Sequence, residues 1–436
     1  MKRDVKMRIV LPCAAVLCCV STMPTMAGTF RAGAAKVSIT SSQDEFPYTA
    51  PRERAYVGIH DEIYARALVL DDGKQRAAIV MVEVTKLPDP ASLVKSVAHE
   101  INAPETNVIV AATHTHNVPL VFFHEDVPNA LQTREIERLT RGALQAVHEA
   151  RARLAPALIA FGEGQAWVNV NNGEQAGLKT GYDPEGPSDK TLAIVKVTKL
   201  DGSPLALLVN YATHAEVMFR SATRDGGYEV SGDLPGAVSR LLEAQPEAAP
   251  IVLYTAAAEA DQTTLFKSLQ PAGRLAAADE GAAGWALLNV QAHRLATGVL
   301  DVASGMSAGV PEAHIAAATA QPVCPGQRVR RDPVSGEPSL EDAPPVAIPL
   351  SMIRINDIVL AGVGGDVASD IGRQFKVASS GVHPTLISMA NGSLGYLLTD
   401  ASYEHPGHGV MGSPVRSHCA APAIVGGLLR LAKPAN

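Results

Sequence analysis

Two histidines, His114 and His116, follow the apolar run "VIVAA" in the stretch "TNVIVAATHTH". They stand one residue apart, so both side chains would face the same side if a strand continued through them. Such a pair suits two metal ligands, or one metal ligand beside a residue that transfers protons. Two histidines with a purely structural role are the alternative, which this spacing alone does not exclude.

A second stretch, "LALLVNYATHAEVM", repeats the pattern and ends an apolar run with His214. The ends of strands are where α/β sheets place groups that bind ligands. Histidines such as His114 and His214, which end two strands from distant segments, are typical of imidazole ligands for zinc. For His214 too, a structural histidine at the edge of the sheet is the alternative.

A catalytic zinc usually has three protein ligands and an open position for water. Asp366 supplies a carboxylate, because it follows the apolar run "IVLAGVGG" and precedes a helical pattern. The same position suits the N-cap of that helix, and both interpretations remain open. His60 and Asp61 suit a pocket wall or a structural hydrogen bond, and Asp233 suits a helix N-cap better than a catalyst.

These residues are carried by alternating strand and helix patterns, which predict a single large α/β domain with a mixed β-sheet flanked by helices. Strands are expected over 64–73, 75–84, 106–113, 157–165, 192–202, 204–213, 249–258 and 346–365. Helices are expected over 90–101, 130–154, 234–245, 285–303 and 423–433. Residues 320–349 are rich in proline and charge, which predicts a long surface excursion.

The amino terminus is typical of an export signal. Basic residues precede the apolar run "IVLPCAAVLCCV", and small residues follow it. This predicts a signal peptide over 1–27 and one mature domain over 28–436, in a periplasmic or secreted protein, with a retained amino-terminal anchor as the alternative. The apolar run is too short to span a bilayer as a mature helix, and no later stretch reaches that length.

The net charge limits the classes of binding partner, and the cysteine content bears on the cellular compartment. The 436 residues carry a formal charge of -7, which argues against nucleic acid as a partner because that would require a basic face. Only Cys324 and Cys419 lie beyond the predicted signal. In an oxidising compartment they are candidates for a disulfide, with two separate buried thiols as the alternative.

Five stretches carry a family resemblance: "RAGAAKVSIT", "GIHDEIYARALVLDDG", "ATHTHNVP", "VSGDLPGAVSRLLE" and "ANGSLGYLLTDASYE". Together they resemble the catalytic domain of the neutral, non-lysosomal ceramidases over nearly the whole chain beyond the signal. The Thr-His-Thr-His and Asn-Gly…Gly-Tyr stretches are the most specific. The resemblance also implies that the chain lacks the C-terminal β-sandwich of the larger relatives.

The family holds one catalytic zinc through two histidines, a glutamate and a tyrosine, and hydrolyses the amide of ceramide. The resemblance therefore implies a zinc site with these four ligands: His114, His214, Tyr396 and Asp366, the last in the place of the glutamate. It makes His116 the acid/base. It also implies catalytic roles for Tyr396 and for Asp261 and Thr263 in the stretch "EADQTTL".

This chain departs from the family close to the substrate. Asn172 and His408 stand where relatives carry an arginine and a tyrosine, Thr263 stands at a serine position, and Glu259 at a glycine position. The prediction is an exported zinc amidohydrolase that acts on an N-acyl, ceramide-like lipid or small molecule, with peripheral contact to membrane lipid. A non-catalytic lipid- or metabolite-binding homologue and a zinc esterase or lactonase are the alternatives.

Overall fold

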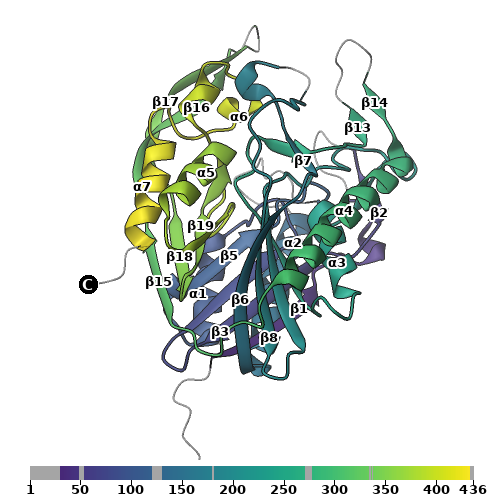
Figure 1. Ribbon diagram of the computed structural model, residues 1–436. Coiled ribbons are helices and arrows are strands. Elements are labelled where there is room, and N and C mark those ends of the chain that lie inside the picture. Colours follow the sequence, from purple (N-terminus) through teal and green to yellow (C-terminus); the bar gives the residue numbers. More distant parts are fainter. Residues whose placement is uncertain are drawn as a thin grey trace, which may run out of the picture.

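The computed structural model describes residues 30–48, 54–119, 130–178, 181–270, 277–332, 335 and 337–432. The signal peptide predicted over 1–27 lies outside this described part. Figure 1 shows a mixed α/β architecture in which sheets form the interior and helices lie outside them.

The largest sheet has eight strands. In spatial order these are β11 (Val252–Ala256), β9 (Pro204–Tyr211), β8 (Thr191–Lys199), β6 (Ala155–Gln165), β1 (Arg31–Ser38), β3 (Tyr64–Asp71), β4 (Arg76–Val82) and β5 (Val108–Ala112). The β4–β5 and β9–β11 pairs are parallel and the others antiparallel, so the expected mixed sheet is confirmed. The strands β4, β5, β9 and β11 are buried almost throughout and largely apolar, as expected where both faces of a sheet are covered.

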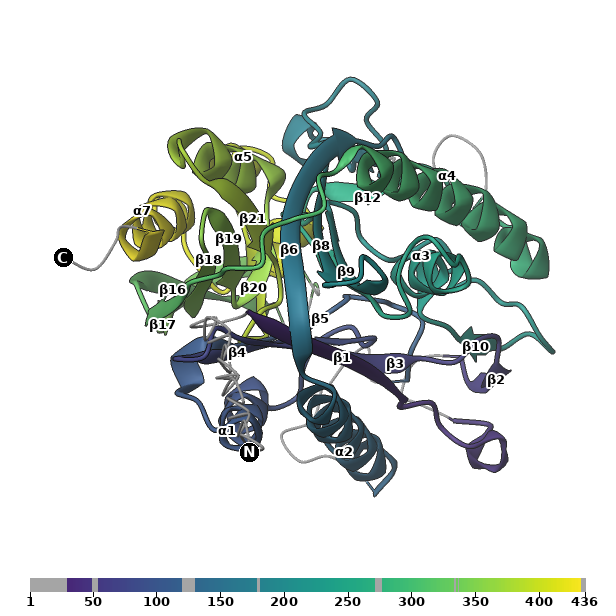
Figure 2. The ribbon, with the colours of Figure 1, turned by 60° about the horizontal axis from the view of Figure 1, so that its bottom comes forward.

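The sheet divides at the start of β6. Only Ala155 and Pro156 of that strand pair with β1, whereas the remainder of the strand pairs with β8. Figure 2 shows β6 leaving the layer of β1, β3 and β4 and rising toward β8 and β9. The two halves of the sheet therefore face different helices.

A second sheet has four strands, in the order β15 (Ile315–Ala320), β18 (Leu350–Ile355), β19 (Ile358–Val363) and β21 (His383–Ile387). Besides the longer β16–β17 pair described below, four short two-stranded pairs are present among the described residues: β2 (Tyr56–Ile59) with β10 (Tyr228–Val230), β7 (Asn169–Asn171) with β12 (Gln262–Thr264), β13 (Leu269–Gln270) with β14 (Ala278–Asp279), and β20 (Gly365–Val367) with β22 (Leu394–Leu397).

One apolar cluster joins the inner faces of the eight-stranded and four-stranded sheets. Leu68 and Ile79 contribute from one half of the large sheet, Ile159 and Leu253 from its other half, and Leu360 from the second sheet. Each of these side chains is at most 2% exposed. The two halves of the eight-stranded sheet and the four-stranded sheet therefore form three walls around one core. The chain segments that follow their strands can meet there.

Helices cover the outer face of each wall. Their bounds are α1 (Pro90–Ile101), α2 (Ala130–Ala152), α3 (Asp233–Glu243), α4 (Gly284–Gly305), α5 (Ser369–Ala378), α6 (His408–Met411) and α7 (Ala420–Ala432). The clusters place α1 and α2 against β3 and β4, α3 and α4 against β8 and β9, and α5 and α7 against β18 and β19. Among the described residues, every helix falls short of the length and apolar character needed to cross a bilayer.

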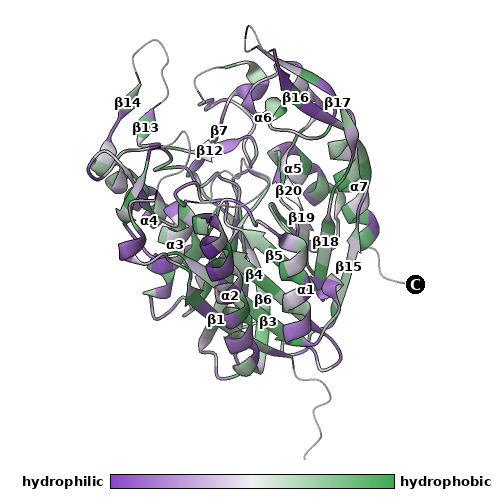
Figure 3. Cartoon of the chain, turned by 180° about the vertical axis from the view of Figure 1, so that it is seen from behind, coloured by the Kyte–Doolittle hydropathy of each residue, from purple (hydrophilic) through white to green (hydrophobic). Residues whose placement is uncertain are grey.

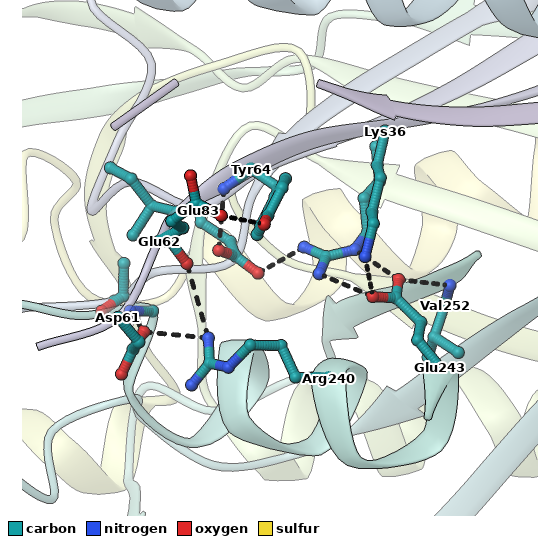
Figure 4. A network of polar contacts seen from close by, with 12 residues as sticks. Lys36, Asp61, Glu62, Tyr64, Glu83, Arg240, Glu243 and Val252 are labelled. Atoms are coloured by element: carbon teal, nitrogen blue, oxygen red, sulfur yellow. Dashed lines mark hydrogen bonds and ion pairs between the residues drawn. The ribbon is translucent and has the colours of Figure 1, made fainter. Parts of the chain in front are cut away.

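A buried ion network fastens α3 to the strands (Figure 4). Arg66 of β3 is 2% exposed and pairs with Glu83 and, at 2.9 Å, with Glu243 of α3. Arg240 of the same helix pairs with Asp61 at 2.8 Å. The contact of Asp61 is therefore a structural link between segments. Removing one partner of such a buried pair costs about 3–5 kcal/mol because a buried charge is left uncompensated.

The proline-rich region 320–349 lies on the surface as expected, but it is not irregular. It forms an antiparallel hairpin of β16 (Val323–Arg331) and β17 (Pro338–Ala347), in which hydrophilic (purple) and hydrophobic (green) residues are mixed in Figure 3. The strand signal was hidden by the prolines. Gly326 permits the close pairing, because a Cβ there would lie 2.0 Å from the carbonyl oxygen of Pro344. The Cys324–Cys419 disulfide is present and ties this hairpin to the start of α7.

Candidate metal centre and active site

The site forms where chain segments leave three inner strands. His114 follows β5, His214 follows β9, and Asp366 follows β19. The first two segments run side by side, because Thr115 and Ala215 form a parallel bridge and the His116 amide donates to the carbonyl oxygen of Ala215 at 3.0 Å. Residues distant in sequence are thus held together by main-chain contacts.

His114 does not extend its strand, contrary to the simplest expectation for the H-x-H pattern. The strand β5 ends at Ala112, and His114 adopts the left-handed conformation with φ of 60°. That conformation is uncommon for a side chain with a Cβ and clusters at functional sites. The turn still brings the rings of His114 and His116 to a centroid distance of 4.7 Å.

Each of the two expected histidine ligands has its Nδ1 anchored by the main chain. His114 Nδ1 lies 2.6 Å from the carbonyl oxygen of Thr85. His214 Nδ1 lies 2.9 Å from that of Glu259 and 3.1 Å from that of Gln262. A carbonyl oxygen accepts only, so Nδ1 carries a proton and Nε2 is the atom left to bind a metal. This second hydrogen bond is typical of histidines that bind a metal.

Asp366 faces both Nε2 atoms. Its Oδ2 lies 3.1 Å from His214 Nε2 and 3.7 Å from His114 Nε2. Within the described part of the chain, both carboxylate oxygens of Asp366 lack a hydrogen-bonding partner. The same holds for Nε2 of His214. The atoms therefore approach one another without sharing a well-directed hydrogen bond.

The N-cap interpretation of Asp366 does not hold. Asp366 lies in β20, opposite Tyr396 of β22, whereas α5 begins only at Ser369. The amide of Ser369 donates instead to Asp261 Oδ1 at 2.8 Å. A side chain other than Asp366 thus satisfies the start of this helix, and the Asp366 carboxylate is free to serve the site.

These atoms fit a cation. Ligands about 2.0–2.3 Å from a tetrahedral zinc lie roughly 3.3–3.7 Å from one another, and the two Asp366 contacts span that range. Ligand nitrogens of His114, His116 and His214 all lie within 4.8 Å of one another. Burial opposes protonation of His214, but the Asp366 carboxylate outweighs it and raises the pKa of His214 to about 10. The site thus attracts positive charge, and a metal would replace that proton.

His116 differs from the two anchored histidines. Both of its ring nitrogens are buried and lack a hydrogen-bonding partner among the described residues. Burial, and then the neighbouring imidazoles of His114 and His214, lower the pKa of His116 well below its usual value. The ring is therefore neutral near pH 7 and can accept a proton from a bound reactant.

Tyr396 completes this group. Its ring lies over Gly412, where a Cβ would come within 2.7 Å of the ring, and its centroid is 6.3 Å from that of His214. Burial, and then the Asp366 carboxylate, raise the pKa of the Tyr396 hydroxyl well above its usual value. The hydroxyl therefore remains a hydrogen-bond donor in the metal-free site.

Asp261 and Thr263 lie behind the site. Asp261 accepts from the amide of Ser369 and, at 2.9 Å, from its hydroxyl, and burial raises the pKa of this carboxyl group. Thr263 donates its hydroxyl to Glu216 Oε1 at 2.6 Å. Neither is among the described residues that line the cavity. Their contacts hold α5 and Glu216 in place.

Glu216 is a site residue that the sequence interpretation missed. Burial alone would raise its pKa, but the ammonium of Lys267, 2.7 Å away, and the nearby imidazoles lower it below its ordinary value. A signal was present in the sequence. "THAE" places Glu216 two residues after His214, just as "THTH" places His116 two residues after His114.

A cavity of about 1000 Å³ opens onto these groups. Asn172 and His408 both line it, as expected for residues near a substrate. The Asn172 amide is held by the carbonyl oxygen of Asp261 at 2.9 Å, and the His408 ring lies 5.6 Å from that of Tyr396. Lys86 also lines the cavity, although no sequence pattern marked it.

Asp233 and His60 are placed outside this cavity. Asp233 is the first residue of α3 rather than its N-cap, and it accepts from the amides of Val217 and Met218 at 3.2 and 2.9 Å. It thereby positions the segment that follows Glu216. His60 stacks on Trp285 at a centroid distance of 3.6 Å.

Comparison with known proteins agrees with this geometry. Residues 30–260 match the family model described as neutral/alkaline non-lysosomal ceramidase, N-terminal. Neutral ceramidase B of Dictyostelium discoideum is 26% identical over 207 residues, which are 43% of this chain and 28% of the relative. Neutral ceramidase of Pseudomonas aeruginosa is 26% identical over 181 residues, 36% of this chain and 26% of the relative. These alignments thus span little more than a quarter of the curated relatives.

The fold match is more extensive. The crystal structure of neutral ceramidase from Pseudomonas aeruginosa superimposes with a TM-score of 0.70 at 16% identity, covering 93% of this chain and 73% of that chain. A ceramidase structure described as complexed with C2 gives a TM-score of 0.69 at 15% identity. At such identities the likeness concerns the fold alone.

Proposed function

Since this chain belongs to the family of neutral/alkaline non-lysosomal ceramidases, we propose that it is a zinc-dependent amidohydrolase that cleaves an N-acyl amide. The observation that carries the proposal is the approach of Asp366 Oδ2 to the Nε2 atoms of His214 and His114, at 3.1 and 3.7 Å, beside the unpartnered ring of His116. A metal site next to a free base is the arrangement that hydrolysis by activated water requires.

In this proposal the metal is held by four side chains: His114, His214, Asp366 and Tyr396. A bound zinc would supply Lewis-acid chemistry, which polarises a carbonyl group and lowers the pKa of water. The carboxylate of Asp366 replaces the glutamate of the relatives. The pairing of β20 with β22 and the 3.1 Å approach of Asp366 to His214 support the assignment of this shorter side chain.

His116 is the acid/base. Its neutral ring accepts the proton of the attacking water as the new bond to the carbonyl carbon forms. The same ring then donates that proton to the nitrogen of the leaving amine as the C–N bond breaks. Tyr396 supplies a hydroxyl for the negative charge that develops on the carbonyl oxygen.

Asp261 and Thr263 support these groups rather than touch the substrate. Asp261 fixes the start of α5, and Thr263 fixes Glu216 on the cavity wall. Asn172 and His408 form substrate-facing walls. We further propose export to the periplasm or the medium, with residues 1–27 as signal and 28–436 as one hydrolase domain, and peripheral contact with lipid.

An ester or lactone would meet the same water-activating groups, so the bond that is cleaved needs a direct test. The test uses zinc-loaded protein with N-lauroylethylamine and ethyl laurate, and mass spectrometry of the products. Amide cleavage that follows zinc content is expected. Cleavage of the ester alone, or no cleavage with a full complement of zinc, would contradict the proposal.

His116→Ala provides the mechanistic control. Because His116 is assigned to proton transfer and not to the metal, this variant should retain zinc and lose about 10²–10⁴-fold in activity. His293→Ala changes an exposed histidine on α4 and should alter neither quantity. Equal loss of zinc in His116→Ala and His114→Ala would show that the division of roles is wrong.

A further inference from the structure

Among the described residues that line the cavity, two cations take no part in the hydrolytic site: Arg220, which is exposed, and Lys86. Lys86 lines the cavity and is only partly exposed. Within the described residues no carboxylate lies within ion-pair distance of its ammonium group, and burial alone accounts for the lowering of its pKa. A partly desolvated ammonium group without a counter-charge is costly, and an anionic ligand would remove that cost.

The main chain around Lys86 is fixed on both sides. The carbonyl oxygen of Thr85 faces His114 Nδ1 at 2.6 Å, and the Thr85 hydroxyl donates to the carbonyl oxygen of Thr115 at 2.7 Å. On the other side, the Ser393 hydroxyl donates to the carbonyl oxygen of Leu87. Lys86 therefore stands between the segment that carries His114 and the segment that carries Tyr396.

Most other charges of the cavity are already engaged or exposed, and Arg220 lies over the Phe219 ring at 5.0 Å. Glu216 pairs with Lys267 at 2.7 Å. Glu174 accepts from the amide of Gly409 at 2.8 Å. Asp366 faces the metal-site histidines, and Glu404 is exposed on the rim. Lys86 is thus the lining cation best placed to meet a charge on the substrate.

We propose that Lys86 recognises a carboxylate on the amine portion of the substrate, so that the preferred substrates are N-acyl amino acids. This inference rests on the proposed amidohydrolase function. The reaction adds water across the amide: the oxygen bonds to the acyl carbon, the C–N bond breaks, and the nitrogen gains both protons of the water. A fatty acid anion and a zwitterionic amino acid leave, so atoms and charge balance.

A single ammonium group matches one carboxylate better than a phosphate dianion. Lysine presents a compact point charge, whereas phosphate is usually held by several donors at once. N-Lauroylglycine and N-lauroyl-O-phosphoethanolamine are therefore the two anionic probes. N-Lauroylethylamine is the uncharged probe of the same acyl length.

The experiment compares zinc-loaded wild type, Lys86→Met and Lys86→Arg on all three compounds. For N-lauroylglycine, Lys86→Met should raise KM roughly 10- to 100-fold with little change in kcat, because a charge-assisted contact is lost. Lys86→Arg should recover most of that loss. KM for N-lauroylethylamine should be unchanged in both. Lys95→Met, on the exposed face of α1, is the matched control.

Calorimetric binding of N-lauroylglycine to metal-free protein gives a second readout, in which Lys86→Met should bind at least about tenfold more weakly. Wild type that cleaves the uncharged amide as well as N-lauroylglycine, with Lys86→Met unaffected, would overturn this inference and leave the amidohydrolase intact. A Lys86-dependent preference for the phosphate probe would overturn the carboxylate assignment. Wild type that cleaves none of the three would instead overturn the proposed function.

Discussion

His214 Nε2 lies 3.1 Å from Asp366 Oδ2, although the two residues follow strands of different sheets. His214 follows β9 of the eight-stranded sheet, and Asp366 follows β19 of the four-stranded sheet. Two different sheets thus contribute atoms to the same candidate metal site. A cation bound there would join the walls as well as serve the reaction.

Replacing either anchored histidine should remove the metal. His114→Ala and His214→Ala each delete a ligand that main-chain carbonyls hold in place. Elemental analysis of the purified variants should find well under one zinc per chain, against about one in wild type. His293→Ala should match wild type. Full zinc occupancy in His214→Ala would refute the ligand assignment.

Removal of the metal should also lower stability. A ligand that binds only the folded state stabilises it by about 4 kcal/mol at a thousandfold excess over Kd. Treatment with a chelator should therefore lower the Tm of wild type, and added zinc should restore it. Asp366→Asn already lacks the carboxylate and should respond much less. An unchanged Tm in chelated wild type would mean that no cation joins the walls.

Asp233 should make stability depend on pH. It is fully buried, and burial raises its pKa to about 6, against about 3.9 for an ordinary aspartate. The folded state therefore binds the proton more tightly than the unfolded state. Its contribution is fully present below pH 4 and is lost as pH rises through 6.

The change amounts to roughly 3 kcal/mol. Denaturant titrations give the unfolding free energy at pH 4 and at pH 7. From pH 4 to pH 7 this free energy should fall more in wild type than in Asp233→Asn. Asp301→Asn, at an exposed position of α4, is the control for the loss of a charge. Parallel curves for wild type and Asp233→Asn would show that Asp233 does not bind a proton in this range.

The sequence predicted the elements better than the details of the site. Long apolar runs located β3, β4, β9 and β19 because burial on both faces leaves little room for polar residues. The same pattern cannot report a left-handed turn at His114, nor distinguish an N-cap from a ligand at Asp366. Those outcomes depend on contacts with Thr85 and Tyr396, which lie far away in sequence.

Lys86 is a second residue whose role could not be predicted from the sequence. Its neighbours in sequence form an ordinary "EVTKLPD" stretch, with no histidine or repeated motif to mark it. It reaches the cavity only because Thr85 bonds to the His114 segment and Leu87 to Ser393. Among the residues that the structure describes, this lysine lacks a counter-charge, which only the three-dimensional arrangement reveals.

The Cys324–Cys419 bridge should contribute to stability. It closes a loop between residues 95 positions apart, and cross-linking a loop of that size is worth about 4–5 kcal/mol in the chain-entropy account. The double variant Cys324→Ala/Cys419→Ala should lose most of this, measured as unfolding free energy without reductant. Adding reductant should lower the stability of wild type but not of the variant. A double variant as stable as oxidised wild type would contradict this.

The final prediction concerns substrate preference. The residues proposed to serve the metal and the proton lie together, whereas Asn172 and His408 line the cavity at positions where the family resemblance implies an arginine and a tyrosine. Losing a guanidinium removes a rigid, multiply hydrogen-bonding donor. A polar group on the substrate that depended on it would be left unpaired, at a cost of about 1–3 kcal/mol.

We therefore expect kcat/KM for ceramide to lie below that for shorter N-acyl compounds, by roughly 10- to 100-fold. The measurement uses one zinc-loaded preparation and matched detergent conditions, so that differences in loading and solubility do not enter. Asn172→Arg is the informative variant, because it restores the donor and should raise kcat/KM for ceramide more than for N-lauroylethylamine. Ceramide emerging as the best substrate of wild type would show that Asn172 and His408 do not set the preference.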